Sequence, residues 1–306
     1  MAARWSTPSG AQWVIGAGPH QATVVEVGGG IREYTVGGVA VVDPYPADAV
    51  CPRSAGQQLA PWPNRLRDGK YTVGDTAYQL PISEPARFNA SHGLVRWSSW
   101  QRVEQTPESI EVSYVLPPQL GYPFALGLST RWSVGADGLR ADHTVVNLGV
   151  SPAPFGFGTH PYLRVADVAV DDLVLHLPAT ERLIVDDRML PIDREQLAGT
   201  PYDFQTPRPI GDLELDTTFG GLTRDDDGLA RVRLSAADGR AVEVWQDAAF
   251  DWVQLYSGVG PSGAARHTLA IEPMSCPPDA FRSGEGLIML APGDRWVGSW
   301  GITPLG

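Results

Sequence analysis

Cysteine is scarce in this chain of 306 residues, which has only Cys51 and Cys276. Two cysteines exclude a disulfide framework and a zinc site built from four cysteines. One bridge between Cys51 and Cys276 stays open as an alternative. We favour two reduced thiols.

Positive charge is also in short supply, with 23 Lys and Arg against 35 Asp and Glu, a net charge of -12. Nucleic acids and anionic membranes attract basic patches, so this balance argues against both as partners and disfavours a polyanionic substrate. No run approaches the ~18 apolar residues of a membrane-spanning helix. The first ten residues lack the apolar segment of a secretory signal, so we expect a cytoplasmic protein.

Several well-known site motifs are missing as well. The chain has no phosphate-binding loop, no His-Glu-x-x-His and no Gly-x-Ser-x-Gly, and Gly156-Phe-Gly158 lacks the third glycine of a dinucleotide site. Asp225-Asp226-Asp227-Gly228 lacks the alternating ligand spacing of a calcium loop and is better interpreted as a solvated hairpin turn. We therefore predict neither a cofactor nor a metal.

Turn-forming residues and alternating strands are what the chain does contain. It has 34 glycines and 27 prolines, well above the usual share, and 43% hydrophobic residues, enough for a large core. Apolar and polar residues alternate, as in half-buried strands, over 22–27, 31–36, 109–116, 141–147 and 241–246. Gly28-Gly29-Gly30 predicts a hairpin between the first two. Only Pro191–Ala198 favours a short helix. We predict an all-β protein, one large antiparallel β-sandwich domain over residues 1–306.

Scattered polar residues in predicted loops are the remaining candidates for chemistry. In Pro61–Gly69, Arg65 offers a planar fork of donors for hydroxyls or carboxylates, and Trp62 offers a flat face for a sugar ring. A surface loop with an arginine salt bridge explains the same residues. His92 before Gly93 is more often a structural hydrogen-bonding group than a functional one.

Two further positions are more suggestive. Pro161 biases His160 toward extended backbone, and Tyr162 adds a second polar tip. Glu272 follows the apolar run 269–271 and precedes Pro273, so it is expected at a strand end among apolar neighbours that raise its pKa. The plain alternative for Glu272 is a salt bridge at the strand end. Asp216 is expected in a loop before Phe219, where an ordinary turn explains it equally well.

Taken in order, these pieces resemble the aldose 1-epimerase (galactose mutarotase-like) family, from about Val24 to Gly301. The resemblance rests on Asn64-Arg65, His92-Gly93, His160-Pro161-Tyr162, Asp216-Thr-Thr-Phe219 and Ile271-Glu272-Pro273. It implies the large twisted β-sandwich of that family and a monosaccharide substrate. It also implies the following roles: general base, Glu272; general acid, His160; substrate binding, Arg65, His92, Asp216, Asn64, Tyr162 and Gln254.

The match is incomplete at one motif. Well-known galactose mutarotases carry Asn-His-Ser/Thr-Tyr-Phe where this chain has Thr159-His160-Pro161-Tyr162-Leu163. The stretch Glu272–Asp279 is similar to a bacterial subgroup with uncharacterised epimerases and proteins linked to sulfosugar use. The resemblance therefore implies acid–base interconversion of sugar anomers and leaves the identity of the sugar open, as the sequence leaves the oligomeric state.

Three other functions compete with this reading. A hexose-6-phosphate 1-epimerase on the same fold needs converging basic residues, for which Arg65, Arg67 and Lys70 are the sequence candidates. A sugar-sensing protein that has lost turnover is expected to lack the acid or the base, and both are present. A glycoside hydrolase could use Asp216 and Glu272 as its carboxylate pair, but His160 is then unexplained.

Overall fold

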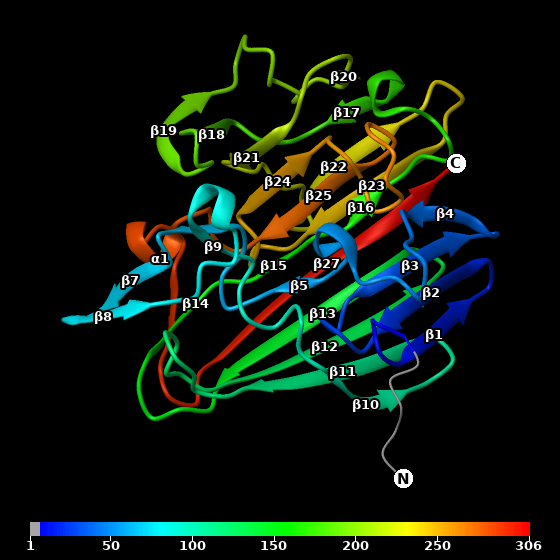
Figure 1. Ribbon diagram of the computed structural model, residues 1–306. Helices are drawn as coiled ribbons and strands as arrows, with labels where there is room; N and C mark the ends of the chain where they lie inside the picture. Colours follow the sequence, from blue (N-terminus) through cyan, green and yellow to red (C-terminus); the bar gives the residue numbers. More distant parts are fainter. Residues whose placement is uncertain (1–6) are drawn as a thin grey trace.

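The computed structural model describes residues 7–306, and strands dominate it (Figure 1). The prediction of no secretory signal rests partly on residues 1–6, which lie outside the described range. The longest helix among the described residues is far too short to cross a membrane. The helical segments are α1 (Ala280–Ser283) and three 3-10 turns, η1 (Pro52–Ser54), η2 (Pro85–Arg87) and η3 (Val170–Asp172).

A sheet of twelve strands forms one layer, in the order β1-β2-β3-β4-β16-β25-β24-β21-β18-β19, with β15 paired to both β25 and β5. Neighbouring strands run antiparallel. The strands are β1 (Gln12–Ala17), β2 (His20–Val25), β3 (Ile31–Val36), β4 (Val39–Val42), β5 (Gln58–Leu59), β15 (Gly158–Thr159), β16 (Tyr162–Leu163), β18 (Glu181–Val185), β19 (Pro191–Gln196), β21 (Asp216–Gly220), β24 (Trp252–Tyr256) and β25 (Leu269–Met274).

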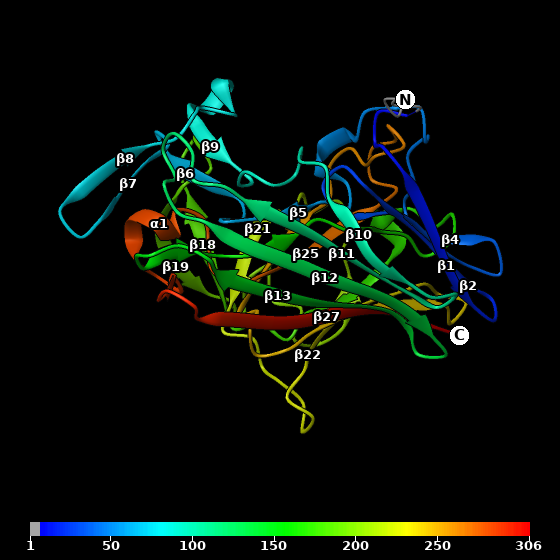
Figure 2. The same ribbon diagram turned by 90° about the horizontal axis from the view of Figure 1, so that it is seen from below.

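A sheet of nine strands forms the second layer, in the order β10-β11-β12-β13-β27-β23-β22-β17-β20. Figure 2 shows β11, β12, β13 and β27 side by side. The strands are β10 (Gln101–Gln105), β11 (Ser109–Leu116), β12 (Leu126–Gly135), β13 (Gly138–Asn147), β17 (Val174–His176), β20 (Arg208–Pro209), β22 (Ala230–Ser235), β23 (Ala241–Gln246) and β27 (Arg295–Leu305). Three two-stranded ribbons complete the fold: β6 (Arg65–Arg67) with β9 (Asn89–Ser91), β7 (Lys70–Val73) with β8 (Thr76–Gln79), and β14 (Ala153–Phe155) with β26 (Ile288–Leu290).

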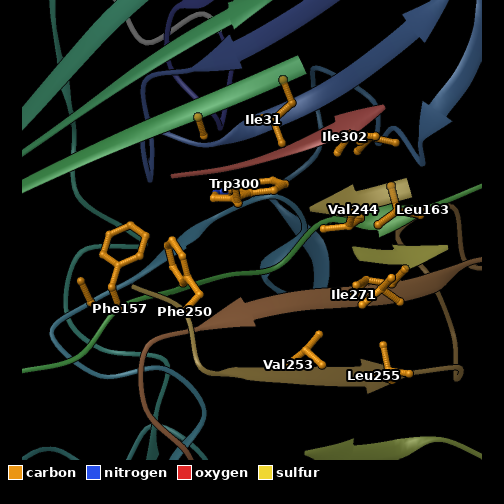
Figure 3. Close-up of a cluster of buried hydrophobic side chains, with 14 of the residues drawn as sticks. Ile31, Phe157, Leu163, Val244, Phe250, Val253, Leu255, Ile271, Trp300 and Ile302 are labelled. Carbon is orange, nitrogen blue, oxygen red and sulfur yellow. The ribbon is translucent and has the colours of Figure 1, made fainter. Parts of the chain in front are cut away.

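The hydrophobic core lies between the two large sheets. Figure 3 shows Val253, Leu255 and Ile271 of the first sheet on the side of their strands that faces Trp300 and Ile302 of the second. Side chains alternate along a strand, so the residues between these core positions point to the opposite face of the twelve-stranded sheet. Gln254 and Glu272 are such residues, and the alternation that builds the core therefore also places the polar site.

A buried chain of hydrogen bonds joins the two sheets. Trp300 Nε1 donates to His143 Nε2 (2.9 Å), so His143 Nδ1 carries the ring proton and donates to Thr130 Oγ1 (2.8 Å). Thr130 in turn donates to Gln58 Oε1 (2.8 Å), and Gln58 Nε2 donates to the Gly29 carbonyl (2.7 Å). These hydrogen bonds fix β5, which pairs with β15 directly before His160.

Most of the sequence-based expectations for secondary structure are confirmed. The alternating segments are strands, β2 and β3 form the predicted hairpin, and residues 225–228 form a turn. Both cysteines are free thiols. The helix predicted over 191–198 is wrong, because Pro191–Gln196 is the edge strand β19. Its pairing with β18, which includes the opposed ion pair Arg182–Glu195, outweighs a short helical signal.

Candidate active site

Polar side chains line up across three neighbouring strands of the twelve-stranded sheet. Glu272 of β25 stands directly opposite Gln254 of β24, which stands opposite Thr218 of β21. The next pair on the same face of β21 and β24 is Asp216 opposite Tyr256. Directly opposed residues of antiparallel strands share a face, so these side chains form one polar surface.

Gln254 is locked between its neighbours on this surface. The Thr218 hydroxyl donates to Gln254 Oε1, so the amide nitrogen faces the other way and donates to Asp216 Oδ1 at 2.7 Å. The orientation of Asp216 is therefore fixed by a residue that is itself fixed, which suits a group that must hold a ligand in one place.

His160 comes to Glu272 from the segment between β15 and β16. Its Nε2 lies 3.4 Å from Glu272 Oε1, and its ring stacks on Tyr162 at 4.8 Å between centroids. The ring of His92 meets that of His160 edge-on at 5.6 Å. His160 Nδ1, His92 Nδ1 and Glu272 Oε2 are buried without a hydrogen-bond partner among the described residues. Unsatisfied buried polar atoms cost free energy, and they are most readily explained by a ligand or water.

The two loops of the first hundred residues that carry Asn64, Arg65 and His92 are tied together. β6 pairs with β9, placing Arg65 opposite Ser91, and the His92 amide donates to the Asn64 carbonyl at 2.8 Å. Asn64 and His92 both have positive φ, of 53° and 60°. Arg53 and Ser54, on the neighbouring turn η1, are also left-handed, with φ of 52° and 57°. Such backbone strain gathers at functional sites.

These elements enclose a cavity of about 410 Å³ over the polar surface. All eight residues proposed from the sequence line it: Asn64, Arg65, His92, His160, Tyr162, Asp216, Gln254 and Glu272. Their convergence supports the candidate site. Their individual roles stay predictions.

Sequence reasoning missed half of the lining and misplaced one residue. The further lining residues are Arg53, Ser54, Ser83, Glu84, Arg87, Ser91, Arg96 and Tyr256. Tyr256 has a detectable signal, since it lies two positions from Gln254 on one strand face. The loop residues have none. Trp62 does not offer a face to a sugar, because it is 3% exposed and packs edge-on against Phe281 in the core.

Burial dominates the electrostatics of the acidic groups. Desolvation raises the pKa of Glu272 well above its usual value, and Asp216 raises it further while Arg65 opposes the shift. Desolvation also raises the pKa of Asp216, although Arg65, Arg87 and the Gln254 hydrogen bond lower it in part. The expected rise for Glu272 thus has the expected cause.

Burial lowers the pKa of both histidines of the site. Burial, assisted by the charges of Arg96 and Arg65, lowers the pKa of His160 to about 3. Burial and His160 itself lower the pKa of His92 well below its usual value. A general acid must carry a proton, and the acidic neighbours Glu272 and Asp216 favour a protonated His160. Desolvation outweighs these neighbours, and the opposite shifts of the two groups favour Glu272 over His160 as the place of a shared proton.

Metal-binding and membrane-spanning features are not found over residues 7–306. No group of three or more His, Cys, Asp or Glu is placed to hold a metal ion in this part of the chain. The absence of a cofactor stays a prediction.

The site can be compared with known proteins. A family model described as aldose 1-epimerase matches residues 12–303. The uncharacterized protein YihR of Escherichia coli (strain K12) is 36% identical over 287 residues, 93% of this chain and 90% of that protein. Galactose mutarotase of Mus musculus is 25% identical over 269 residues, 76% of this chain and 73% of that protein.

Solved structures share the fold. A putative aldose 1-epimerase from Escherichia coli K12 superposes with a TM-score of 0.83 at 21% identity, covering 96% of this chain and 98% of that one. Galactose 1-epimerase from Lactobacillus acidophilus NCFM gives a TM-score of 0.80 at 18% identity, covering 96% and 95%. The predicted all-β sandwich of the galactose mutarotase type is therefore confirmed.

Proposed function

We propose that this chain, which belongs to the aldose 1-epimerase family, interconverts the α and β anomers of a hexose by acid–base ring opening and closing. The observation that carries the proposal is the contact between His160 Nε2 and Glu272 Oε1 on the floor of the cavity. A proton acceptor and a proton donor side by side match the two atoms of a hemiacetal that exchange protons, the C1 hydroxyl and the ring oxygen.

The proposed reaction moves two protons and breaks one bond. Glu272 takes the proton of the C1 hydroxyl while His160 gives one to the ring oxygen. The bond between C1 and the ring oxygen breaks, its electron pair goes to that oxygen, and C1 becomes an aldehyde. Rotation about C1–C2 and the reverse proton transfers close the ring on the other face. Each positioned proton-transfer group contributes about 10²–10⁴-fold in rate.

The opposite pKa shifts of Glu272 and His160 fit this scheme. Neutral Glu272 with neutral His160 holds the same number of protons as ionised Glu272 with protonated His160. The first arrangement is the one the pair adopts while the sugar is open. A bound hydroxyl that donates to Glu272, and a ring oxygen that accepts from His160, favour the second arrangement. No proton is gained or lost over a cycle.

The other lining residues have proposed binding roles. Asp216 and Gln254, locked together by their hydrogen bond, would anchor the sugar hydroxyls that stay still while C1 turns. Arg65 and His92 would hold hydroxyls near the reacting end and stabilise developing charge. Asn64 and Tyr162 complete the walls beside them.

A phosphorylated hexose is the second candidate substrate, favoured by one observation. Arg53, Arg65, Arg87 and Arg96 all line the cavity despite the net charge of -12. Of the three basic residues proposed from sequence, Arg65 lines the cavity, whereas Arg67 is paired with Asp186 (3.1 Å) and Lys70, like Arg67, lies outside the cavity. Charge-assisted contacts from arginine suit phosphate oxygens.

Anomer exchange measured by NMR tests both candidates. The protein is mixed in turn with glucose, galactose, sulfoquinovose and glucose 6-phosphate, and exchange between anomer signals is compared with buffer. Glu272→Gln serves as the inactive variant and Glu195→Gln, on the edge strand β19, as the matched control.

Each result has a clear meaning. Exchange of an unphosphorylated sugar that is lost in Glu272→Gln but kept in Glu195→Gln supports the proposal. Exchange of glucose 6-phosphate alone supports the second candidate. Sugar binding without exchange on any of the four overturns both and indicates a sugar sensor.

A further inference from the structure

Glu84 is an acidic residue of the cavity wall for which the proposed reaction has no use. It lies directly before η2, and its carboxyl group faces Arg65. Arg65 Nε donates to both Glu84 oxygens, at 3.0 and 3.2 Å. Arg87 Nη1 and Asn89 Nδ2 add hydrogen bonds of 3.1 Å each. Three residues thus converge on one carboxylate.

The backbone holds Glu84 and Arg65 in one rigid unit. The Glu84 amide donates to the Asn89 carbonyl at 2.9 Å, and the Asn89 amide donates back at 3.2 Å. Asn89 belongs to β9, which pairs with β6, the strand that begins at Arg65. The separation of the two side chains is therefore set by strand pairing rather than by flexible loops.

This arrangement decides which way the guanidinium points. Its Nε is taken by Glu84, and its Nη1 reaches Asn64 Oδ1 at 3.4 Å. Over residues 7–306, Nη2 has no hydrogen-bond acceptor, and Arg65 lines the cavity. The planar fork is thus held by one edge and left open at the other, as required for binding a hydroxyl.

We propose that Glu84 is a positioning residue that turns the open edge of Arg65 toward the sugar and offsets its positive charge beside the acidic groups of the site. The inference rests on the proposed function, in which Arg65 binds substrate and Glu272 moves a proton.

The directions of the pKa shifts around the site are consistent with this role of Glu84. Burial raises the pKa of Glu84. The hydrogen bonds and the charge of Arg65, together with the hydrogen bonds of Asn89 and Arg87, outweigh this effect and bring the pKa below its usual value, so Glu84 is ionised at neutral pH. Arg65 lowers the pKa of Glu272 and of Asp216, and Glu84 raises that of Asp216. The titratable or charged groups that line the cavity with Glu272 are Arg53 on η1, Arg65 on β6, Glu84 and Arg87 at η2, His92 and Arg96 after β9, His160 before β16, Tyr162 on β16, Asp216 on β21 and Tyr256 on β24.

Removing the charge of Glu84 therefore exposes Glu272 to an uncompensated arginine. In Glu84→Gln we expect the titration of the Glu272 carboxyl to move to lower pH. The alkaline limit of kcat/KM should move with it. KM for the sugar should rise about tenfold, the equivalent of one charge-assisted hydrogen bond, with a smaller change in kcat.

The test is a ¹³C NMR titration of carboxyl-labelled glutamate in the full chain, with the Glu272 signal assigned from Glu272→Gln. The proteins compared are the wild type, Glu84→Gln, the control Glu195→Gln, Arg65→Gln and the double variant with both Glu84→Gln and Arg65→Gln. An acid shift in Glu84→Gln that disappears in the Arg65→Gln background, with no shift in the control, supports the proposal.

Two results overturn it: an unshifted Glu272 in Glu84→Gln, or the same shift with and without Arg65. If Glu84→Gln does not fold, Glu84→Asp keeps the charge but shortens the reach, and an unchanged KM in that variant overturns the positioning role. The titration needs no turnover. A wild type that exchanges no sugar therefore disproves the proposed function separately from this inference.

Discussion

His160 Nε2 and Glu272 Oε1 meet at 3.4 Å, brought together because β15 and β16, on either side of the histidine, both pair with β25, the strand of the glutamate. The sheet itself thus sets the spacing of the proposed acid and base. Glu272 stands on β25, and His160 stands on a two-residue connection held at both ends by strands that pair with β25.

Replacing His160 tests the donor. His160→Asn removes the proton-transfer group and is expected to lower kcat/KM for anomer exchange by about 10²–10⁴-fold with the fold kept. His267→Asn, at an exposed histidine outside the cavity, should match the wild type. Equal activity of His160→Asn and His267→Asn would remove His160 from the reaction.

The pH dependence of kcat/KM follows from the two shifted pKa values. The proposed reaction needs one proton shared between Glu272 and His160. On acidification the pair takes up this proton when Glu272 is protonated, and it takes up a second, inactivating proton when His160 is protonated as well. With ordinary values near 4.5 and 6.5, activity would form a narrow bell between them. Because burial lowers the pKa of His160 to about 3, the second proton binds only at lower pH, and the acid limit of activity moves below about pH 4.5. The raised pKa of Glu272 keeps the first proton bound to higher pH than an ordinary carboxyl group would. We expect kcat/KM to stay high below about pH 4.5, measured after subtraction of the uncatalysed rate. A loss of kcat/KM that begins near about pH 4.5 on acidification would contradict the shift of His160.

The ionised Glu272 carboxylate should also lower the free energy of unfolding. Its pKa is raised in the folded state, so the folded protein binds the proton more tightly than the unfolded chain, and stability falls as pH rises from about 4.5 through the folded pKa. Glu272→Gln lacks this loss. We expect it to be more stable than the wild type by about 0.5–2 kcal/mol near pH 8, with a smaller gain near pH 5. Urea unfolding of both proteins at the two pH values measures the difference. A gain that is larger near pH 5 would reverse the sign of the argument.

Asn64 offers a test that separates backbone strain from side-chain chemistry. Its φ of 53° suits glycine and disfavours alanine. The free energy of unfolding of Asn64→Ala should therefore be about 1 kcal/mol lower than that of Asn64→Gly, measured by urea unfolding. Both variants lack the amide beside Arg65, so both should lose sugar affinity to the same degree. If the two folded variants bound sugar with different affinities, loss of the Asn64 amide alone would not explain the change in binding.

Alternation of apolar and polar residues over segments such as 31–36, 109–116 and 241–246 was enough to predict the sandwich, because it marks one face of each strand as buried. It was not enough at Pro191–Gln196, where the partner strand β18 decides the conformation and no local pattern announces it. The eight predicted site residues came from their resemblance to a family, in motifs far apart in the chain. Their convergence on one cavity is a property of the fold.

The electrostatic state of the site was beyond the sequence for a different reason. Whether His160 is charged depends on how much water it loses and on Arg65 and Arg96, whose distance from it is set by three separate loops. Glu84 and Arg53 were overlooked for the same reason. A loop residue that faces a cavity follows no periodic sequence pattern from which its position could be predicted.

The division of labour within the cavity wall has an evolutionary consequence. Glu272, Gln254 and Asp216 stand on adjacent strands whose other faces form the core, so they are constrained twice, by chemistry and by folding. Arg53, Arg87 and Arg96 stand outside the two large sheets, on segments that core packing does not dictate. The arginines can therefore be exchanged without disturbing the core, and with them the proposed choice of sugar, while the proposed proton-transfer pair stays in place.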